Sequence, residues 1–212
     1  MPERDVVLIF GMTGMGKTWY TRAMLRSMHR AVIMDPQDEY REFERIDDIG
    51  ALLESMARPV FRVTHAEPGN FPWLCRGARS AGRCWIIIEE AQLIMPANER
   101  PPSEFLDVIY RGRHQEVSVA LVAQRPTTVN IAARSQWSHL ITFKQMERAD
   151  VQWLESVVGF SLPVQELQRG EYLHVTGGNV RRKVLQLPPI QPRIDAVTTT
   201  HAEEPERKEN EV

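Results

Sequence analysis

The sequence is poor in cysteine, in long hydrophobic runs and in net charge. Its two cysteines, Cys75 and Cys84, fit neither a disulfide framework nor the spacing of a zinc site, so we expect reduced thiols. No apolar segment approaches the roughly 20 residues of a transmembrane helix, and the charged start Met1–Asp5 does not resemble a signal peptide. These absences predict a soluble protein, or one held at a membrane only by a partner.

The charges nearly cancel, because 26 Lys and Arg stand against 28 Asp and Glu. The net charge of −2 excludes a broadly basic nucleic-acid coat but not a local basic stripe. Two groups could form such a stripe: Arg76, Arg79 and Arg83, whose helical spacing puts them near one face, and Arg181–Lys183 near the end of the chain. For the first group, a solvated helix face is the preferred interpretation and the DNA-binding stripe the alternative.

With 212 residues, 42% of them apolar, the chain can form one sizeable α/β domain. Solid apolar runs alternate with amphipathic helical patterns, which predicts a mainly parallel central sheet covered by helices on both faces. The expected strands are Val6–Phe10, Ala31–Met34, Val60–Val63, Trp85–Ile88, Val117–Ala123 and Leu140–Phe143. The expected helices are Trp19–Met28, Ile46–Met56, Ser103–Tyr110 and Glu147–Gly159.

The end of the chain has a different pattern. Two strand-like runs, Glu171–Thr176 and Val180–Leu187, flank Gly177-Gly178-Asn179, which predicts a C-terminal β-hairpin. We therefore expect one domain over residues 1–187. Residues 188–212 form a Pro-rich, acidic segment with almost no large apolar residues, which predicts a disordered tail.

A glycine-rich motif between the first strand and the first helix predicts a nucleotide site. Gly11-Met12-Thr13-Gly14-Met15-Gly16-Lys17-Thr18 matches G-x-x-x-x-G-K-[ST], the P-loop that wraps phosphates with backbone N–H groups. Lys17 is expected to neutralise the β- and γ-phosphates of ATP, and the Thr18 hydroxyl to hold Mg²⁺. Trp19, directly after the motif, either flanks the adenine or packs against the fold.

Two adjacent acids end a buried strand and predict hydrolysis. In Trp85–Gln92, an apolar run leads to Glu89 and Glu90, a Walker B pattern. Glu89 is expected to hold the Mg²⁺ shell, reaching the metal through water, and Glu90 to orient and polarise the attacking water. The alternative is an acidic helix N-terminus.

Further candidates surround the next strand. Gln124, at the tip of Val117–Ala123, can sense the γ-phosphate or help to place the attacking water, or it merely caps the strand. Upstream, Arg111 or Arg113 can stabilise transition-state charge, in cis or from a neighbouring subunit, unless they belong to a solvated basic turn. The sequence does not separate the two arginines.

Four pieces of sequence, in order, resemble the FtsK–HerA superfamily of P-loop DNA-translocating ATPases, over residues 5–145. The pieces are Gly11–Thr18, Asp35–Tyr40, Ile86–Glu90, and Arg111–His114 leading to Ala123–Pro126. The resemblance implies a RecA-like fold, a ring expected to be a hexamer, and ATP with Mg²⁺ bound between subunits. It also implies that Gln124 is a phosphate sensor and that Arg111 or Arg113 is the arginine finger. Glu89 departs from the family, which usually has Asp there.

The small size of the chain resembles the genome-packaging ATPases of tailless, membrane-containing double-stranded DNA viruses. That resemblance implies sequence-independent binding of duplex DNA, a capsid-vertex or membrane-protein partner, and a location in the host cytoplasm or at a virion vertex. A cellular HerA-like, conjugation or secretion ATPase is the near alternative. A small nucleotide kinase and a slow nucleotide-dependent assembly switch are the more distant ones, and Glu89, Glu90 and Gln124 argue against the kinase.

Overall fold

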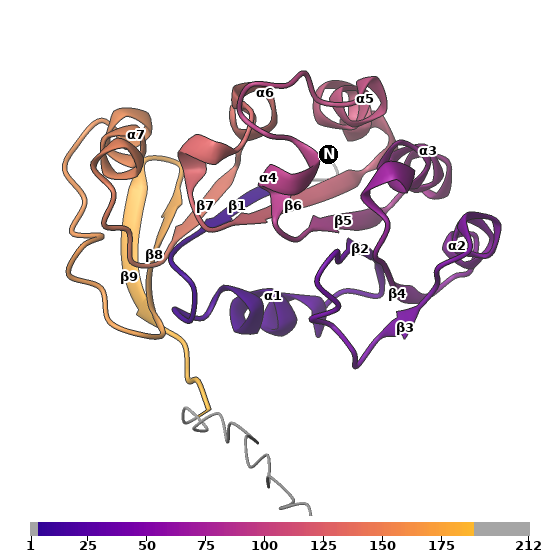
Figure 1. The fold of residues 1–212 in the computed structure, drawn as a ribbon, viewed down its shortest axis with the longest axis horizontal. Helices are drawn as coiled ribbons and strands as arrows, with labels where there is room; N and C mark the ends of the chain where they lie inside the picture. The colour runs from indigo at the N-terminus through magenta and orange to yellow at the C-terminus, as the bar shows by residue number, and fades with distance from the viewer. Residues whose placement is uncertain (1–3, 189–212) are drawn as a thin grey trace, which may run out of the picture.

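A single nine-stranded sheet runs through the protein, in a computed structural model that describes residues 4–188 (Figure 1). The strand order is β3-β4-β2-β5-β6-β1-β7-β8-β9. All pairs from β3 to β7 are parallel, and β8 and β9 add an antiparallel hairpin. The strands are β1 (Val6–Phe10), β2 (Arg30–Met34), β3 (Glu44–Arg45), β4 (Phe61–His65), β5 (Cys84–Ile88), β6 (Val117–Ala123), β7 (His139–Thr142), β8 (Glu171–Thr176) and β9 (Asn179–Val184).

Helices cover the two faces of the sheet unequally (Figure 1). α1 packs on one face together with the irregular chain after β2, and the other helices pack on the opposite face. They are α1 (Lys17–Leu25), α2 (Ile49–Met56), α3 (Phe71–Ala81), α4 (Ala91–Ile94), α5 (Ser103–Arg111), α6 (Ile131–Arg134) and α7 (Arg148–Val158). Short 3₁₀ turns lie at Pro68–Asn70, Gly112–Gln115 and Pro126–Thr128.

The predicted fold class is confirmed: a mainly parallel sheet, helices on both faces and a terminal hairpin. β1 explains why the strands read as solid apolar runs. Leu8 and Phe10 face one hydrophobic cluster while Val7 and Ile9 face the other, and all four are buried. A strand covered on both faces cannot alternate apolar with polar residues.

Several boundaries differ from the predictions. The expected helix Ile46–Met56 starts at Ile49, because the Asp48 carboxylate accepts a hydrogen bond from Ala51 N at 2.8 Å and caps it. α1 starts at Lys17 and ends at Leu25, and β9 ends at Val184. The tail predicted for residues 188–212 lies outside the described residues, apart from Pro188.

The structure places the three arginines proposed as one possible basic stripe in two different settings. Arg83 lies beyond the end of α3, in a left-handed conformation (φ 44°). Arg76 and Arg79 do lie on α3, but their guanidinium groups pair with carboxylates of α5: Arg76 with Glu104 at 2.5 Å and Arg79 with Asp107 at 2.9 Å. These two arginines therefore join α3 to α5.

Candidate active site

Three parallel strands bring the predicted site residues to one edge of the sheet. β6 lies between β1 and β5, with Phe10 beside Ala123 and Ile88 beside Leu121. The residues after these strands, Gly11, Glu89 and Gln124, therefore come next to one another. The P-loop, the two acids and the amide belong to one site because of this strand order.

The P-loop requires glycine where it leaves β1. Gly11 N donates to Gln124 O at 3.2 Å, and a Cβ on Gly11 would lie 2.5 Å from Cβ of Phe143. The other end of the loop, Gly16, has φ 119° and precedes the first turn of α1. The N-terminus of α1 consequently opens toward the cleft, as phosphate binding requires.

Lys17 folds back over the loop. Its Nζ donates to Gly11 O at 2.8 Å and lies 3.3 Å from Met12 O. Burial lowers the pKa of Lys17, and the nearby carboxylates of Glu90, Glu89 and Glu39 oppose that shift. A partly desolvated cation held this way is positioned for an anionic ligand.

A cleft of about 590 Å³ opens beside the P-loop. It contains most of the predicted nucleotide-binding and catalytic residues: Thr13, Gly14, Gly16, Lys17, Thr18, Trp19, Glu89, Glu90 and Gln124. Gly11, Met12 and Met15 belong to the loop but do not line the cleft. Trp19, directly after the motif, lines the cleft, whereas the next residue, Tyr20, packs on Tyr172 and Phe143.

Glu89 is held by a residue from the turn after β2. Tyr40, itself buried, donates its hydroxyl hydrogen bond to the Glu89 carboxylate. The Asp35 carboxylate shapes this turn by accepting from Glu39 N at 3.0 Å and Tyr40 N at 2.9 Å. Burial raises the pKa of Glu89 to about 8, although the bond from Tyr40 acts in the opposite direction.

Glu90 points toward Gln124. Its backbone is left-handed (φ 46°, ψ 52°), which is uncommon for a residue other than glycine. The carboxylate accepts from Gln92 Nε2 and, at 3.4 Å, from Gln124 Nε2. Gln145 in turn donates to Gln124 O at 2.9 Å and fixes the strand tip. The second acid and the amide thus lie within contact distance beside the P-loop.

Oxygen ligands suited to Mg²⁺ gather at the start of α1. Thr18 Oγ1 donates to the Glu39 carboxylate at 2.7 Å, and Glu89 and Glu90 line the same cleft. Hydroxyl and carboxylate oxygens are what Mg²⁺ takes, with one or two protein ligands completed by phosphate oxygens and water. The residues present therefore fit the metal. Within residues 4–188 there is no group of three or more His, Cys, Asp or Glu side chains able to hold a metal by themselves.

Arg111 and Arg113 lie away from this cleft. Arg111 ends α5 and Arg113 lies in the turn before β6, at the end of that strand opposite Gln124. The seven residues of β6 separate the two ends by about 20 Å at the usual rise per residue. Both arginines are exposed, and Arg111 lies 3.5 Å from Asp107. Neither can reach the P-loop of its own chain.

Sequence patterns alone assign no role to three residues that line the cleft. Glu39 lies in a segment that resembles a family motif, and Arg169 and Leu187 carry no local signal because they come from the far end of the chain. Tyr40, which lies outside the cleft lining but contacts Glu89, belongs to the same motif. The neighbouring Arg125 is structural: its Nε donates to the fully buried Asp150 carboxylate at 2.7 Å.

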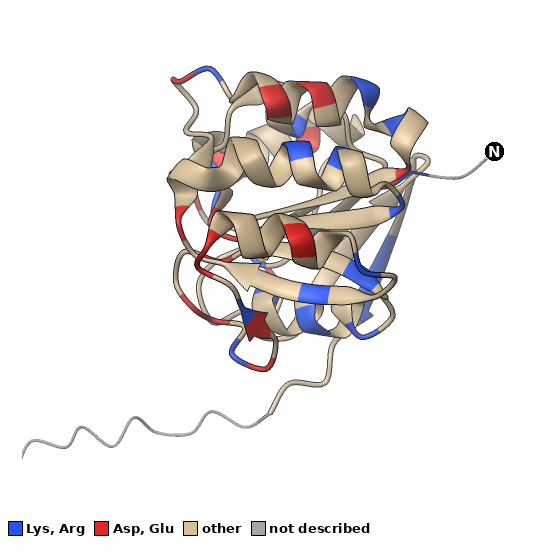
Figure 2. Cartoon of the chain, turned by 90° about the vertical axis from the view of Figure 1, so that its right-hand side faces the viewer, with Lys and Arg blue, Asp and Glu red and all other residues tan. Residues whose placement is uncertain are grey.

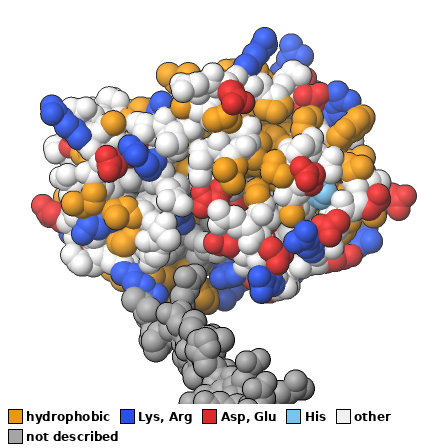
Figure 3. Space-filling model, in the orientation of Figure 1, with side chains coloured by type: hydrophobic (Ala, Val, Ile, Leu, Met, Phe, Trp, Pro, Cys, Tyr) orange, Lys and Arg blue, Asp and Glu red, His pale blue; other side chains and the backbone are white. Residues whose placement is uncertain are grey.

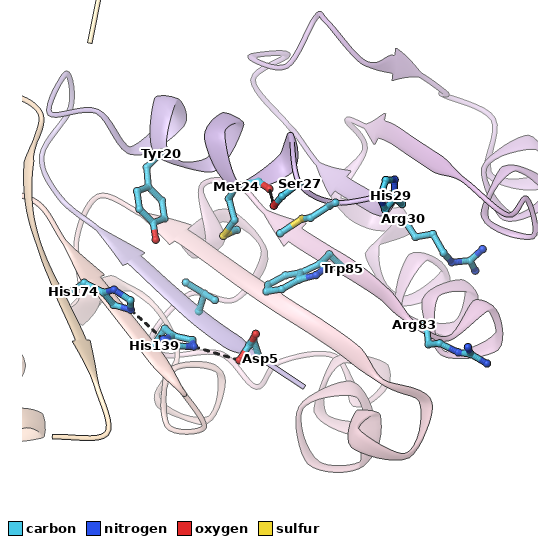
Figure 4. Close-up of a pocket in the computed structure, with 12 residues that line it drawn as sticks. Asp5, Tyr20, Met24, Ser27, His29, Arg30, Arg83, Trp85, His139 and His174 are labelled. Carbon is cyan, nitrogen blue, oxygen red and sulfur yellow. Dashed lines mark hydrogen bonds and ion pairs between the residues drawn. The ribbon is translucent and has the colours of Figure 1, made fainter. Parts of the chain in front are cut away.

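A second cavity of about 490 Å³ lies between α1 and the opposite end of the sheet. Figure 4 shows Tyr20 and Met24 above Trp85, with Asp5, His139 and His174 in a row at one side. His139 Nε2 lies 3.3 Å from Asp5 Oδ1, and its Nδ1 lies 3.0 Å from Nε2 of His174. None of the predicted site residues lines this cavity.

Charged residues are distributed unevenly in one view of the fold. In the lower half of Figure 2, the Asp and Glu positions lie mostly along one edge, and Lys and Arg positions are more frequent toward the opposite edge. In the view of Figure 3, acidic side chains are most numerous in the right half, near the segment after β2. Among the described residues, no helix is long and apolar enough to cross a membrane.

The comparisons with known proteins agree with this geometry. The model of the helicase HerA central domain matches residues 5–148. No curated protein is similar enough in sequence to match.

Three solved structures illustrate the likeness in fold. The genome packaging NTPase B204 from Sulfolobus turreted icosahedral virus 2, in complex with AMPPCP, is 17% identical, with a TM-score of 0.73 over 87% of this chain and 100% of B204. VirB4 of Thermoanaerobacter pseudethanolicus is 12% identical, with a TM-score of 0.62 over 86% of this chain and 90% of VirB4. The pCW3 conjugation coupling protein TcpA, with ATPγS, is 15% identical, with a TM-score of 0.58 over 85% of this chain and 60% of TcpA.

The matched family model spans more than half of the chain and includes the P-loop, the acidic pair and Gln124. The protein therefore belongs to the family of the HerA helicase central domain, within the FtsK–HerA P-loop ATPases.

Proposed function

We propose that the protein hydrolyses ATP and uses the energy to move double-stranded DNA into a viral capsid. The observation that carries hydrolysis is the contact between Gln124 and Glu90, 3.4 Å apart beside the P-loop. Phosphate binding alone needs neither group. A carboxylate and an amide that meet next to the γ-phosphate position are suited to hold and polarise a water molecule.

The residues predicted for the site divide the reaction among them. Lys17 and the N-terminus of α1 bind the phosphates, and Gln124 orients the attacking water. Thr18 and, through water, Glu89 would hold Mg²⁺, with Glu39 close by. Glu90 accepts a proton from that water as it attacks the γ-phosphorus. Mg²⁺, when bound, neutralises charge on the β- and γ-phosphate oxygens.

Packaging is the favoured role because the likeness to B204 extends over the whole of that protein. A ring, expected to contain six copies, would place Arg111 or Arg113 at the neighbour's cleft, since neither reaches its own. Duplex DNA would be bound through its phosphates, without regard to sequence. Docking on a capsid-vertex or membrane protein, and a location in the host cytoplasm or at the virion vertex, are parts of the same proposal.

ATPase measurements on two variants, with and without duplex DNA, test the proposal. Lys17→Ala should lose nucleotide binding and activity. Glu90→Gln should still bind ATP but lower kcat about 100-fold or more, because it removes the proton acceptor. Glu54→Gln, an exposed change on α2, is the matched control and should leave kcat unchanged.

The alternatives predict different results. Normal turnover by Glu90→Gln would refute the assignment of the water-activating acid. Transfer of phosphate to a small molecule would indicate a kinase, and tight ATP binding with negligible turnover would indicate an assembly switch. Duplex DNA should stimulate the ATPase activity of a packaging motor and equally that of a conjugation or cellular translocase. A reconstituted packaging assay separates them, because only the packaging motor should move DNA into a capsid.

A further inference from the structure

Among residues 4–188, one arginine of the nucleotide cleft forms no ion pair with a carboxylate. Four basic side chains line the cleft: Lys17, Arg22, Arg41 and Arg169. Arg22 pairs with Glu42 at 2.7 Å, and Arg41 with Asp38 at 3.1 Å. Within residues 4–188, the side chain of Arg169 makes a single hydrogen bond, from Nη2 to Pro188 O at 2.9 Å, and no ion pair. Beside Lys17, it is the cation of this cleft that remains free for an anionic ligand.

The segment that carries Arg169 is attached to the P-loop itself. Gly170 N donates to Met15 O at 3.0 Å, inside the motif. Leu185 N donates to Gly170 O at 2.8 Å, and this bond brings the chain after β9 to the same place. Two segments from the end of the chain therefore form one wall of the cleft.

Leu187 closes that wall against the last glycine of the motif. A Cβ built on Gly16 would lie 3.1 Å from Cδ1 of Leu187, so the leucine side chain covers the glycine. Leu187 is half-buried and lines the cleft. The wall thus offers an apolar side chain and a cation next to the N-terminus of α1.

The order of the strands decides which end of a nucleotide meets this wall. Glu90 and Gln124 follow β5 and β6, on one side of β1, while Arg169 precedes β8 on the other side. A triphosphate that lies across the P-loop with its γ-phosphate at Gln124 consequently directs its α-phosphate and nucleoside toward Arg169 and Leu187.

We propose that Arg169 binds the α-phosphate and that Leu187 packs against the ribose and base, so that the C-terminal wall is the nucleoside end of the site. This inference rests on the proposed function. The contacts of Arg169 and Leu187 are made to parts of ATP that do not change during hydrolysis, so they are equally strong in the ground state and in the transition state. They therefore set the affinity for ATP and ADP and leave kcat unchanged.

Binding of ATP, ADP and inorganic tripolyphosphate to the intact chain, measured by calorimetry with Mg²⁺, tests each contact. Arg169→Gln should weaken ATP and ADP equally, about tenfold, because it removes a charge-assisted hydrogen bond. Leu187→Ala should weaken ATP about fivefold through lost apolar contact, yet leave tripolyphosphate, which has no nucleoside, unaffected. Arg62→Gln, at an exposed position on β4, is the matched control.

The outcomes separate this inference from the proposed function. Unchanged affinity in Arg169→Gln would overturn the inference while the wild-type protein still binds and hydrolyses ATP. A fall in kcat with unchanged affinity would also overturn it, because the arginine would then act in the transition state. Failure of the wild type to bind ATP would overturn the proposed function and this inference together.

Discussion

Glu90 has a strained backbone conformation at the point where its carboxylate contacts Gln124. Its left-handed conformation directs the carboxylate toward Gln124 rather than along the direction of β5. Such a conformation costs of the order of 1 kcal/mol in a residue with a side chain. The contact with Gln124 provides a functional reason for that cost.

Glu89 differs from Glu90 in its surroundings. It is 5% exposed, and Tyr40 is the hydrogen-bond donor to its carboxylate. Tyr40 lies in the turn after β2. The glutamate side chain, longer than the usual Asp, lets Glu89 reach the Tyr40 hydroxyl. Burial raises its pKa to about 8, well above the ordinary value of 4.5.

This raised pKa predicts a pH dependence of stability in the nucleotide-free protein. Between pH 4.5 and about 8 the folded chain holds a proton that the unfolded chain has released, so Glu89 lowers stability as the pH rises through that window. Glu89→Gln removes the titration. Its melting temperature relative to wild type should therefore increase between pH 6 and pH 9, by several degrees at ~2–4 °C per kcal/mol.

The measurement is thermal unfolding at both pH values without Mg²⁺ or nucleotide. Glu54→Gln, an exposed substitution on α2, should differ from wild type by the same amount at pH 6 and pH 9. A difference for Glu89→Gln that does not change with pH would show that Glu89 titrates normally.

Among the secondary-structure elements, the terminal hairpin presents exposed basic residues that we propose as contacts for DNA. Arg181 and Lys183 are exposed and lie opposite His174 and Tyr172, on the α1 side of the sheet. The pKa of His174 is lowered, first by burial and then by the nearby His139, Lys183 and Arg181. The two hairpin cations therefore act on this histidine. Arg182 belongs to the other face and pairs with Glu171 at 2.7 Å. Charged residues on an edge strand also prevent strand-to-strand aggregation, which is the competing explanation.

Substitution of the hairpin cations distinguishes these explanations. If Arg181 and Lys183 each contact a DNA phosphate, the double change to alanine should weaken duplex binding and reduce the salt dependence of log K by about 2. Fluorescence anisotropy over a series of salt concentrations measures both. Arg76→Ala is the control, because Arg76 already pairs with Glu104. An unchanged salt slope would leave only the protective role for the hairpin.

At the scale of the whole molecule, the proposed arginine finger requires a second copy of the chain. The cleft lies at one edge of the sheet, whereas Arg111 and Arg113 lie at the opposite edge, beyond the length of β6. An arginine finger that reaches the cleft of a neighbouring copy requires contacts in which different faces of the two copies meet, that is, head-to-tail contacts.

This arrangement predicts complementation between inactive subunits. The variant that removes the arginine finger, Arg111→Ala or Arg113→Ala, should have no ATPase activity by itself. Lys17→Ala should also be inactive by itself. In an equal mixture, a Lys17→Ala copy can supply its arginine to an intact P-loop at about a quarter of the interfaces of a random head-to-tail ring. ATPase activity should therefore reappear on mixing. If both arginine variants keep full activity alone, the finger is another residue.

Much of this protein is determined locally and could be predicted from its sequence. Gly11–Thr18 needs only its own backbone and the start of α1 to form a phosphate loop, and Glu89-Glu90 needs only the strand before it. The fold class follows from solid apolar runs such as Val6–Phe10, since burial on both faces leaves that pattern in each strand. The hairpin follows in the same way from Gly177-Gly178, both at positive φ.

The tertiary structure alone decided which of these pieces meet. Gln124 meets Glu90 because β6 lies between β1 and β5. Arg76 and Arg79 pair with carboxylates because α5 packs on α3. Leu187 joins the cleft because the chain after β9 returns to Gly16. The physical reason is distance along the chain. Sequence patterns report interactions between residues a few positions apart, whereas contacts between Gly170 and Met15, or between Gly16 and Leu187, depend on the packing of the whole sheet.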